Sequence, residues 1–383
     1  MELEGLDRRA FLARSAGVAF ALTPLPRRWL ASGRAARSTD LQVGLDRDST
    51  ILVNGAPLFP FISWKADIAD LPANVRLGIN VFMGTSASDE SAFAQAVGNA
   101  GAYYIAPYDP TRPADPPSTI GYYLEDEPDG HGFLPSALPQ TQRVTATGKL
   151  VFETFTAHFW SKAADPPAGG KTLYPQYFAN VDVAGTDVYP YAKFCGNATV
   201  TNASVFDVQR DLVQDAAGKP TFQWIEATAL GGSCADPGNP QLTPARARAE
   251  LWDAVAAGAK GLGIFTWANQ GGIWQSFLVA PDIQDQIKAE LARISSLSAA
   301  LLSTPQPVRT RPNTPLRATA RVYGGRTYVI AVNNSAAPLT TAFGVPAIAA
   351  RSASVWGENR SVRVNRGGMS DRFDAYDVHV YVA

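Results

Sequence analysis

Two glutamates stand where a pair of carboxyl groups could act together on one bond. Glu127 lies in the apolar segment IGYYLEDEP (120–128), and Glu226 lies near the end of the segment TFQWIEA (221–227). One carboxylic acid can protonate a leaving oxygen while an opposed carboxylate acts on the other side of the bond, which is the chemistry of glycosidic bond cleavage. The pattern therefore indicates a hydrolase of sugars, provided that the fold brings both segments to one face.

Other polar and aromatic residues follow apolar segments of the same kind. Ligand sites combine apolar and aromatic walls with a few polar groups that fix the orientation of the ligand. We therefore expect a substrate-binding set at the ends of these segments, consisting of Asp126, Tyr189, Trp267, Asp187, His158, Trp64 and Asn269.

Each of these residues also has a structural interpretation. The acidic run 125–129 could be a solvated turn, although alternation along Tyr123, Glu125 and Glu127 places these three side chains on one face of a strand. Glu226 could instead pair with an arginine in the core, because a buried carboxylate needs a partner or a function. The aromatic residues could be core residues, and His158 could be a satisfied loop histidine. If the acidic residues do gather at one rim, that rim contains Glu125, Asp126, Glu127, Asp129, Asp187 and Glu226.

The scaffold predicted for these residues is a parallel barrel. Short apolar segments alternate with Ala-rich amphipathic segments, which is typical of βα units. Eight such strands predict a (β/α)8 barrel, an α/β fold whose active site lies at the C-terminal ends of the strands. The rival doubly wound sheet usually carries a Gly-rich phosphate turn after its first strand, and none is present here. The predicted strands span 58–64, 79–84, 103–108, 120–128, 150–156, 181–190, 221–227 and 262–267.

Local signals place two further elements. Thr243 and Pro244 predict the N-cap and first position of a helix that ends at Gly258. Asn54-Gly55 predicts a hairpin before the first barrel strand, where it would cap the bottom of the barrel.

The pattern changes after about residue 300. A Pro-rich linker over 303–315 is followed by strands of alternating character with no helix between them, which predicts a small C-terminal antiparallel β-sandwich over 316–383. The expected organisation is thus a leader over 1–40, a catalytic barrel over 41–302, the linker and the sandwich.

The leader has the order of an export signal. Arg8-Arg9 is followed by Phe11-Leu12 and a short apolar run over 15–25, which resembles a twin-arginine signal. The run is too short to span a bilayer comfortably, so we expect a secreted or cell-envelope protein without an integral membrane segment in the mature chain. A basic leader without export function is the alternative.

The two cysteines are interpreted in the light of export. Cys195 and Cys234 are the only cysteines of the chain, and an oxidising compartment favours one disulfide between them. Metal binding there is disfavoured because no histidine stands near either cysteine. We expect no metal and no cofactor, since three histidines in the whole chain cannot supply a typical metal-ligand set.

Composition excludes several classes of protein. The 383 residues carry 33 Lys and Arg against 34 Asp and Glu, a formal net charge of −1, which gives no overall electrostatic footprint for nucleic acid. With 46% hydrophobic and 17% charged residues the chain is not disordered. We expect a monomer whose partner is an oligo- or polysaccharide.

Together these features resemble the large clan of retaining (β/α)8 glycoside hydrolases. Members of that clan keep an Asn-Glu-Pro motif with the acid/base on strand four, and a nucleophilic Glu on strand seven. Here the motif is Asp126-Glu127-Pro128. The resemblance implies Glu127 as acid/base, Glu226 as nucleophile, Tyr189 as the residue that holds the nucleophile, and Trp267 as a sugar platform.

The Asp-for-Asn replacement has a physical consequence. The clan's Asn donates a hydrogen bond to a sugar hydroxyl, whereas an ionised Asp126 can only accept one. Its negative charge beside Glu127 would also raise the pKa of that residue, as a general acid requires.

The leading hypothesis is an exported glycosidase that cleaves a β-linked glycan by double displacement, with the two carboxyl groups about 5–5.5 Å apart. A second hypothesis pairs Asp187 with Glu127 in an inverting or α-specific glycosidase. A third is a non-catalytic glycan-binding protein on a barrel scaffold. The identity of the sugar, and whether cleavage is internal or at chain ends, stay open.

Overall fold

The computed structural model describes residues 41–139, 144, 147–156, 170–191, 202–228, 241–270, 273–275 and 279–383; of 268–270 and 273–275 it describes the backbone. The predicted leader 1–40, His158, Cys195 and Cys234 lie outside the described residues, so the export signal and the disulfide stay predictions.

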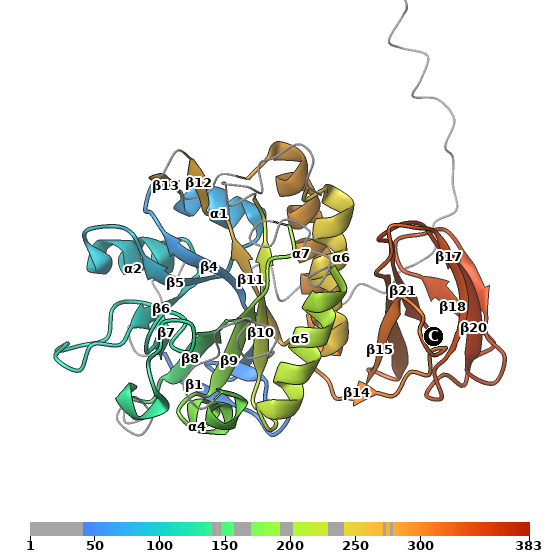
Figure 1. Cartoon of the computed structure of the whole chain (residues 1–383), viewed down its shortest axis with the longest axis horizontal. Coiled ribbons are helices and arrows are strands. Elements are labelled where there is room, and N and C mark those ends of the chain that lie inside the picture. Colours follow the sequence, from blue (N-terminus) through green and yellow to red (C-terminus); the bar gives the residue numbers. More distant parts are fainter. Residues whose placement is uncertain are drawn as a thin grey trace, which may run out of the picture. The chain divides into compact units, whose positions relative to one another are not determined.

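Eight parallel strands close into a barrel, in which β11 pairs with β4 through Leu262 and Phe61 (Figure 1). The predicted fold class is confirmed, and each predicted strand corresponds to one barrel strand. The fourth and sixth strands end earlier than predicted, so the polar residues that follow them belong to loops at the rim. The strands are β4 (Phe61–Ala66), β5 (Val81–Thr85), β6 (Tyr103–Pro107), β7 (Thr119–Tyr123), β8 (Leu150–Phe155), β9 (Val183–Asp187), β10 (Thr221–Glu226) and β11 (Gly261–Phe265).

Helices cover the outside of the barrel. The predicted helix is confirmed as α6, which begins where the Thr243 side chain accepts a hydrogen bond from the Arg246 amide and ends before Gly258 at φ 109°. That left-handed conformation is one that glycine adopts readily. The α-helices are α1 (Leu71–Leu77), α2 (Glu90–Asn99), α4 (Tyr174–Ala179), α5 (Asn202–Asp215), α6 (Pro244–Ala257) and α7 (Pro281–Leu301).

A three-stranded sheet closes the N-terminal end of the barrel. It contains β1 (Val43–Leu45), β2 (Ile51–Val53) and β3 (Ala56–Leu58). The predicted hairpin is confirmed: Asn54 and Gly55 both have positive φ, 51° and 75°, as a two-residue type I′ turn requires. Ile51 and Val53 share one core cluster with residues inside the barrel, so the open end of the barrel is the opposite one.

Large aromatic side chains fill the barrel against glycines of adjacent strands. A Cβ built on Gly185 would lie 2.1 Å from Cζ of Phe222, and one built on Gly263 would lie 2.1 Å from Cε3 of Trp224. Each glycine pairs with a residue of β10, Phe222 with Gly185 and Trp224 with Gly263. The small residues therefore leave the space that the rings occupy.

The C-terminal residues form two antiparallel sheets, as predicted, with strand orders β14-β15-β16-β21-β18-β19 and β17-β20. Their core includes Phe343, Phe373 and Tyr381. The strands are β14 (Pro305–Gln306), β15 (Leu316–Tyr323), β16 (Arg326–Asn333), β17 (Leu339–Gly344), β18 (Ser352–Val355), β19 (Ser361–Arg363), β20 (Gly368–Phe373) and β21 (Val378–Val382); a separate pair, β12 (Ala268–Gln270) and β13 (Ile273–Gln275), follows the last barrel strand.

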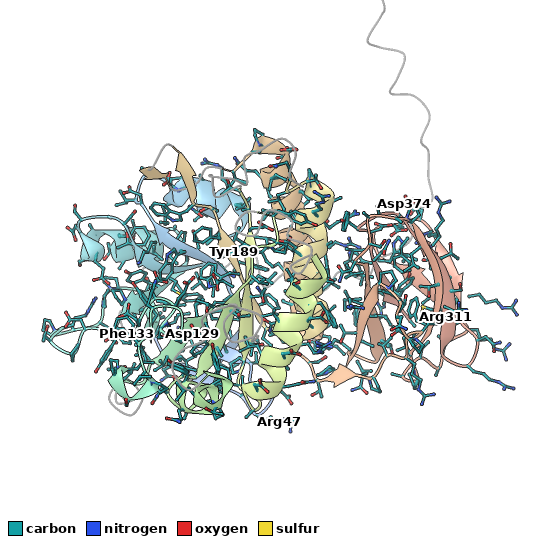
Figure 2. All side chains as sticks on the ribbon, viewed as in Figure 1. Arg47, Asp129, Phe133, Tyr189, Arg311 and Asp374 are labelled. Atoms are coloured by element: carbon teal, nitrogen blue, oxygen red, sulfur yellow. The ribbon has the colours of Figure 1, made fainter. Side chains whose placement is uncertain are left out.

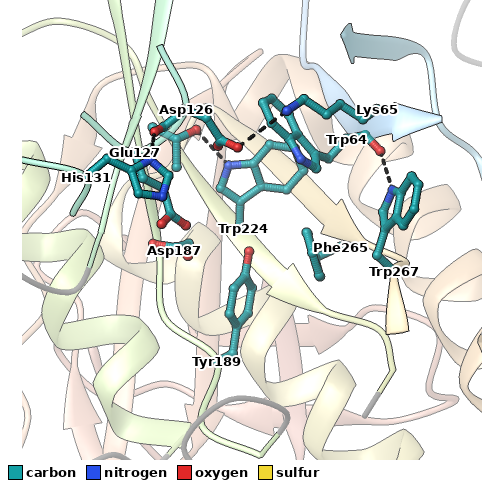
Figure 3. A pocket seen from close by; sticks show the side chains of 11 residues that line it. Trp64, Lys65, Asp126, Glu127, His131, Asp187, Tyr189, Trp224, Phe265 and Trp267 are labelled. Atoms are coloured by element: carbon teal, nitrogen blue, oxygen red, sulfur yellow. Dashed lines mark hydrogen bonds and ion pairs between the residues drawn. The ribbon is translucent and has the colours of Figure 1, made fainter. Parts of the chain in front are cut away.

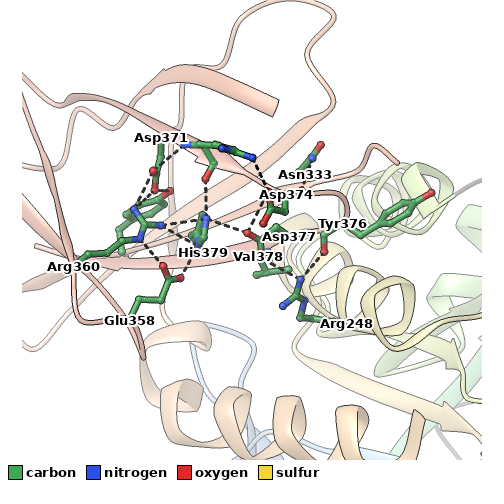
Figure 4. A network of polar contacts seen from close by, with 12 residues as sticks. Arg248, Asn333, Glu358, Arg360, Asp371, Asp374, Tyr376, Asp377, Val378 and His379 are labelled. Atoms are coloured by element: carbon green, nitrogen blue, oxygen red, sulfur yellow. Dashed lines mark hydrogen bonds and ion pairs between the residues drawn. The ribbon is translucent and has the colours of Figure 1, made fainter. Parts of the chain in front are cut away.

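The C-terminal sheets contact the helical layer of the barrel through α6. Ile330, Val332 and Val380 belong to the same core cluster as the barrel helices. Arg248 of α6 forms an ion pair with Asp377 at 3.1 Å (Figure 4). In the described part of the chain, no helix is long and apolar enough to cross a membrane.

The packing of rings on glycines predicts a sharp difference between two Gly→Ala substitutions. Gly185→Ala forces Phe222 to move and should lower the free energy of unfolding by about 1–3 kcal/mol. Gly44→Ala in β1 is the matched control, because nothing lies within 4 Å of a Cβ at that position. Urea denaturation of both variants measures the difference, and equal stabilities would contradict the packing described here.

Candidate active site

The C-terminal ends of the barrel strands surround a cavity of about 440 Å³ (Figure 3). This volume falls in the range of small-molecule sites, roughly 300–1,000 Å³. Its walls come from β4, β8, β9, β10 and β11 and from the loops that follow β7, β9 and β11. The lining residues are Trp64, Lys65, Asp126, Glu127, His131, Thr154, Asp187, Tyr189, Trp224, Phe265 and Trp267.

One side of the cavity is acidic. Glu127, in the loop after β7, and Asp187, the last residue of β9, lie on the same side of the cavity, with Asp126 next to them (Figure 3). Glu127 adopts φ 48°, a left-handed conformation that non-glycine residues rarely adopt. Such strain is found preferentially at functional sites, where the surrounding structure enforces it.

Lys65 brings a positive charge to Asp126. Its Nζ lies 3.5 Å from Oδ2 of Asp126 and 4.6 Å from the ring centroid of Trp64. Burial raises the pKa of Asp126 and the charge of Lys65 opposes that rise, while the charge of Glu127 adds to it. Lys65 also has positive φ, 40°, so Asp126 lies between two residues, Lys65 and Glu127, that are both held in an unusual backbone conformation.

Tryptophans form the other side of the cavity (Figure 3). Trp267 donates its Nε1–H to the Trp64 carbonyl at 2.9 Å, and Trp224 donates to Oγ1 of Thr154 at 2.9 Å. The rings of Trp64 and Trp224 meet edge to face with centroids 6.1 Å apart. Each indole is therefore fixed in orientation, and the apolar wall is preorganised.

Tyr189 supplies a neutral hydroxyl group to the cavity. Burial raises the pKa of Tyr189 well above its ordinary value, and the charges of Asp187 and Glu127 raise it further. The phenol therefore stays protonated at neutral pH and can donate a hydrogen bond into the cavity. Its ring packs against Phe265 at 5.3 Å, which fixes its position.

His131 is a cavity residue that the sequence reasoning missed. Its Nδ1 lies 2.6 Å from the Asp126 carbonyl, which can only accept, so Nδ1 carries the hydrogen. The ring lies beside the carboxylates of Glu127 and Asp187 (Figure 3). Only its closeness to Glu127 in the sequence could have indicated it.

Glu226 is located differently from the other predicted residues. Its side chain is completely buried and does not line the cavity. Oε1 of Glu226 accepts a hydrogen bond from the Tyr191 amide at 2.8 Å, and Glu250 of α6 forms a side-chain hydrogen bond with Glu226. Burial raises the pKa of Glu250 well above its ordinary value, and the charge of Glu226 adds to that effect. Two hydrogen-bonded carboxyl groups must share a proton, and the raised pKa of Glu250 keeps that proton in the pair.

Glu153 and Asp129 are two more buried carboxyl groups that hold the acidic loop in place. Glu153 of β8 accepts hydrogen bonds from the amides of Glu125 at 3.2 Å and Thr154 at 3.1 Å. Burial raises the pKa of Glu153 well above its ordinary value. The sequence signal for Glu153 is a charged residue inside the otherwise apolar segment LVFETFT.

The expectation that Asp129 belongs to the acidic rim is wrong. Asp129 is buried and accepts hydrogen bonds from the Thr156 amide at 3.1 Å and from the Tyr174 hydroxyl at 2.6 Å. Its carboxylate thus ties the end of the β7 loop to the end of β8 and to α4. Asp129 supports the site without facing it.

Part of the chain is similar to a known protein family. A family model described as "Beta-galactosidase", glycoside hydrolase family 42, matches residues 154–280. The expected resemblance to (β/α)8 glycoside hydrolases is confirmed. No curated protein matches the chain.

Solved structures share the fold. A glycoside hydrolase family 5 protein from Bacteroides vulgatus has a TM-score of 0.57 at 12% identity, covering 89% of this chain and 93% of that one. An α-amylase from Geobacillus thermoleovorans, complexed with acarbose, also has a TM-score of 0.57, at 11% identity, with 84% and 98% covered. At these identities the likeness establishes the barrel fold alone.

Most of the predicted substrate-binding residues meet in the cavity at the mouth of the barrel: Trp64, Asp126, Asp187, Tyr189 and Trp267. His158 lies outside the described residues, and the side chain of Asn269 is likewise undescribed, its backbone belonging to β12. Among the described side chains, no group of three or more His, Cys, Asp or Glu residues could hold a metal ion.

The buried pair predicts a pH-dependent effect of Glu250→Gln. Because the pKa of Glu250 is raised in the folded state, its contribution to stability is complete below the ordinary value of 4.5 and is lost as the pH rises toward the folded-state pKa. Glutamine does not titrate, so the variant should gain stability relative to the wild type as pH increases above 4.5, by at most about 1.4 kcal/mol per pH unit. Denaturant unfolding across the pH range measures this gain. A constant difference between the two proteins would show that Glu250 holds no proton in the fold.

Proposed function

We propose that the protein is a glycoside hydrolase that cleaves a β-linked glycan in the cavity at the barrel mouth. The observation that carries the proposal is that Glu127 and Asp187 share one side of a cavity whose other side is formed by fixed tryptophans (Figure 3). Carboxyl groups supply the acid and base chemistry of glycosidic cleavage, and the apolar wall receives the ring of a sugar.

Glu127 is assigned the acid/base role. It lines the cavity from the loop that follows the fourth barrel strand, directly before Pro128, and hydrogen bonds within that loop hold it there. The amide of His131 donates to the Glu127 carbonyl at 2.9 Å, which closes that loop. This is the position that the resemblance to the glycoside hydrolase clan implied.

Asp187 is proposed as the partner carboxylate. It lines the same cavity as Glu127, whereas Glu226 is buried against Glu250 and the Tyr191 amide. Of the two partners that the sequence offered, the geometry favours Asp187. Double displacement through Glu226 stays a prediction, and it requires Glu226 to leave its present hydrogen bonds and reach the cavity.

The substrate proposed for the first assay is an aryl β-galactoside. The family description "Beta-galactosidase" supports this choice, and the match runs from the end of β8 past β11, a range that contains six of the eleven cavity-lining residues. Asp126 accepts hydrogen bonds and the phenol of Tyr189 donates them, so the cavity can recognise sugar hydroxyls of either role.

We also propose that the protein is exported. The order Arg8-Arg9, Phe11-Leu12 and apolar run supports a twin-arginine signal. Replacing Arg8 and Arg9 by lysines should keep the protein in the cytoplasm, which fractionation of the producing cells measures.

The carboxylate assignment predicts a graded set of activities. Glu127→Gln and Asp187→Asn should each lower kcat on an aryl β-galactoside by about 10²–10⁴, the usual contribution of acid–base groups. Asp109→Asn is a control, because that exposed carboxylate does not line the cavity. Glu226→Gln keeps the hydrogen-bonding shape of the buried pair and should cost less than about tenfold.

Two results would change the assignment, and a third measurement reports the stereochemistry. Azide rescue of Glu226→Ala with an inverted glycosyl azide product would restore Glu226 as the nucleophile. Proton NMR of the first-formed product then reports whether the anomeric configuration is retained or inverted. Binding without turnover on a panel of aryl glycosides and wall polysaccharides would instead favour the non-catalytic hypothesis.

A further inference from the structure

The charge of the chain is divided unevenly between its domains. Residues 303–383 contain ten arginines, no lysine and four carboxylates, a net charge of +6. Residues 41–302 contain 16 basic and 26 acidic residues, a net charge of −10. The near-neutral total therefore conceals a strongly basic C-terminal domain, and such asymmetry indicates a charged partner.

The four carboxylates of residues 303–383 already interact with arginines (Figure 4). Every one of them forms an ion pair, so they leave most of the arginines of the domain without a counter-charge. The pairs are Glu358–Arg360 at 2.6 Å, Asp371–Arg360 at 2.8 Å, Asp374–Arg372 at 3.4 Å and Asp377–Arg248 at 3.1 Å.

Three of the remaining arginines surround a cavity of about 530 Å³. Arg351, Arg363 and Arg366 line it together with Asn365, and none of its nine lining residues is acidic or aromatic. In the described part of the chain, no carboxylate lies within ion-pair distance of these three arginines. All the charged residues that line this concave surface are therefore positive.

The backbone around this cavity is fixed. The Val364 amide donates to the Arg351 carbonyl at 2.9 Å, and the Val345 amide donates to the Gly367 carbonyl at 2.7 Å. Arg366 and Gly367 form the turn with φ 49° and 75°. The backbone positions from which these arginines project are therefore fixed, so a ligand has to order only their side chains.

We infer that this cavity binds the carboxylate groups of an acidic polysaccharide chain. The exclusive use of arginine fits, because its planar guanidinium pairs with two oxygens of a carboxylate at once. The absence of aromatic lining residues disfavours single-stranded nucleic acid, whose bases stack on aromatic rings. The choice of a glycan rests on the proposed function of the barrel.

Further arginines extend the positive field beyond the cavity. Arg309, Arg311 and Arg326 are exposed, and Arg311 projects from the surface of the C-terminal strands (Figure 2). The Arg309 backbone pairs with Gly344, which precedes the Val345–Gly367 contact at the cavity. These exposed arginines would attract a polyanion to the domain before it reaches the cavity. Its binding should therefore weaken as the salt concentration rises.

The test uses the whole protein and polygalacturonate as the probe. Isothermal titration calorimetry compares the wild type with the triple variant Arg351→Gln, Arg363→Gln, Arg366→Gln. We expect the Kd of the triple variant to rise by about tenfold or more, since three charge-assisted contacts are lost. The matched control removes three exposed positive charges from the barrel, at Arg47, Arg76 and Lys288, and should bind almost as tightly as the wild type.

The outcomes separate this inference from the proposed function. Hydrolysis of the neutral aryl β-galactoside should be equal in the wild type and in the triple variant. Absence of binding to polygalacturonate, or an equal loss in both triple variants, would overturn the cavity as an anion site even if the glycosidase activity is found. Tighter binding of a DNA oligonucleotide, lost in the same triple variant, would overturn the glycan assignment.

Discussion

The barrel interior has to be filled, and the aromatic residues of β10 fill it. Phe222 and Trp224 occupy space that glycines on β9 and β11 leave open. Trp224 has a second role, because its ring belongs to the wall of the cavity and its indole nitrogen is bound to Thr154. The packing that stabilises the barrel therefore also forms part of the cavity wall. The stability of the barrel and the shape of the cavity depend on the same strand, β10.

The acidic residues divide into those that line the cavity and those that support it from behind. Glu153 and Asp129 each accept several hydrogen bonds, which offset part of the cost of removing a carboxylate from water. The buried pair of Glu226 and Glu250 solves the same problem by sharing a proton. Glu127 and Asp187 line the cavity, and the loop that carries Glu127 depends on that buried support. An acidic rim is thus a layered structure in which only some carboxyl groups can meet a substrate.

Local patterns predicted the fold well because they depend on nearby residues alone. The caps of α6 at Thr243 and Gly258 and the turn at Asn54-Gly55 follow from backbone preferences that a short segment carries with it. The strand pattern placed Asp126, Asp187 and Trp267 at the rim for a similar reason: in a parallel barrel every strand ends at the same face.

What the sequence could not predict depends on contacts between distant segments. The direction of the Glu226 side chain is decided by Glu250 on α6 and by the Tyr191 amide, and neither is visible in the strand that carries Glu226. The role of Asp129 was misjudged for the same reason, because Tyr174 and Thr156 arrive from later segments. The position of His131 in the cavity depends on the conformation of the loop after β7, which no periodic sequence pattern predicts. The net charge of −1 did not reveal the basic C-terminal domain, because the negative charge of residues 41–302 offsets the positive charge of residues 303–383 in the sum. A polyanionic substrate would be repelled by the barrel alone, and a basic domain on the same chain would hold it near the acidic site and raise its effective concentration there.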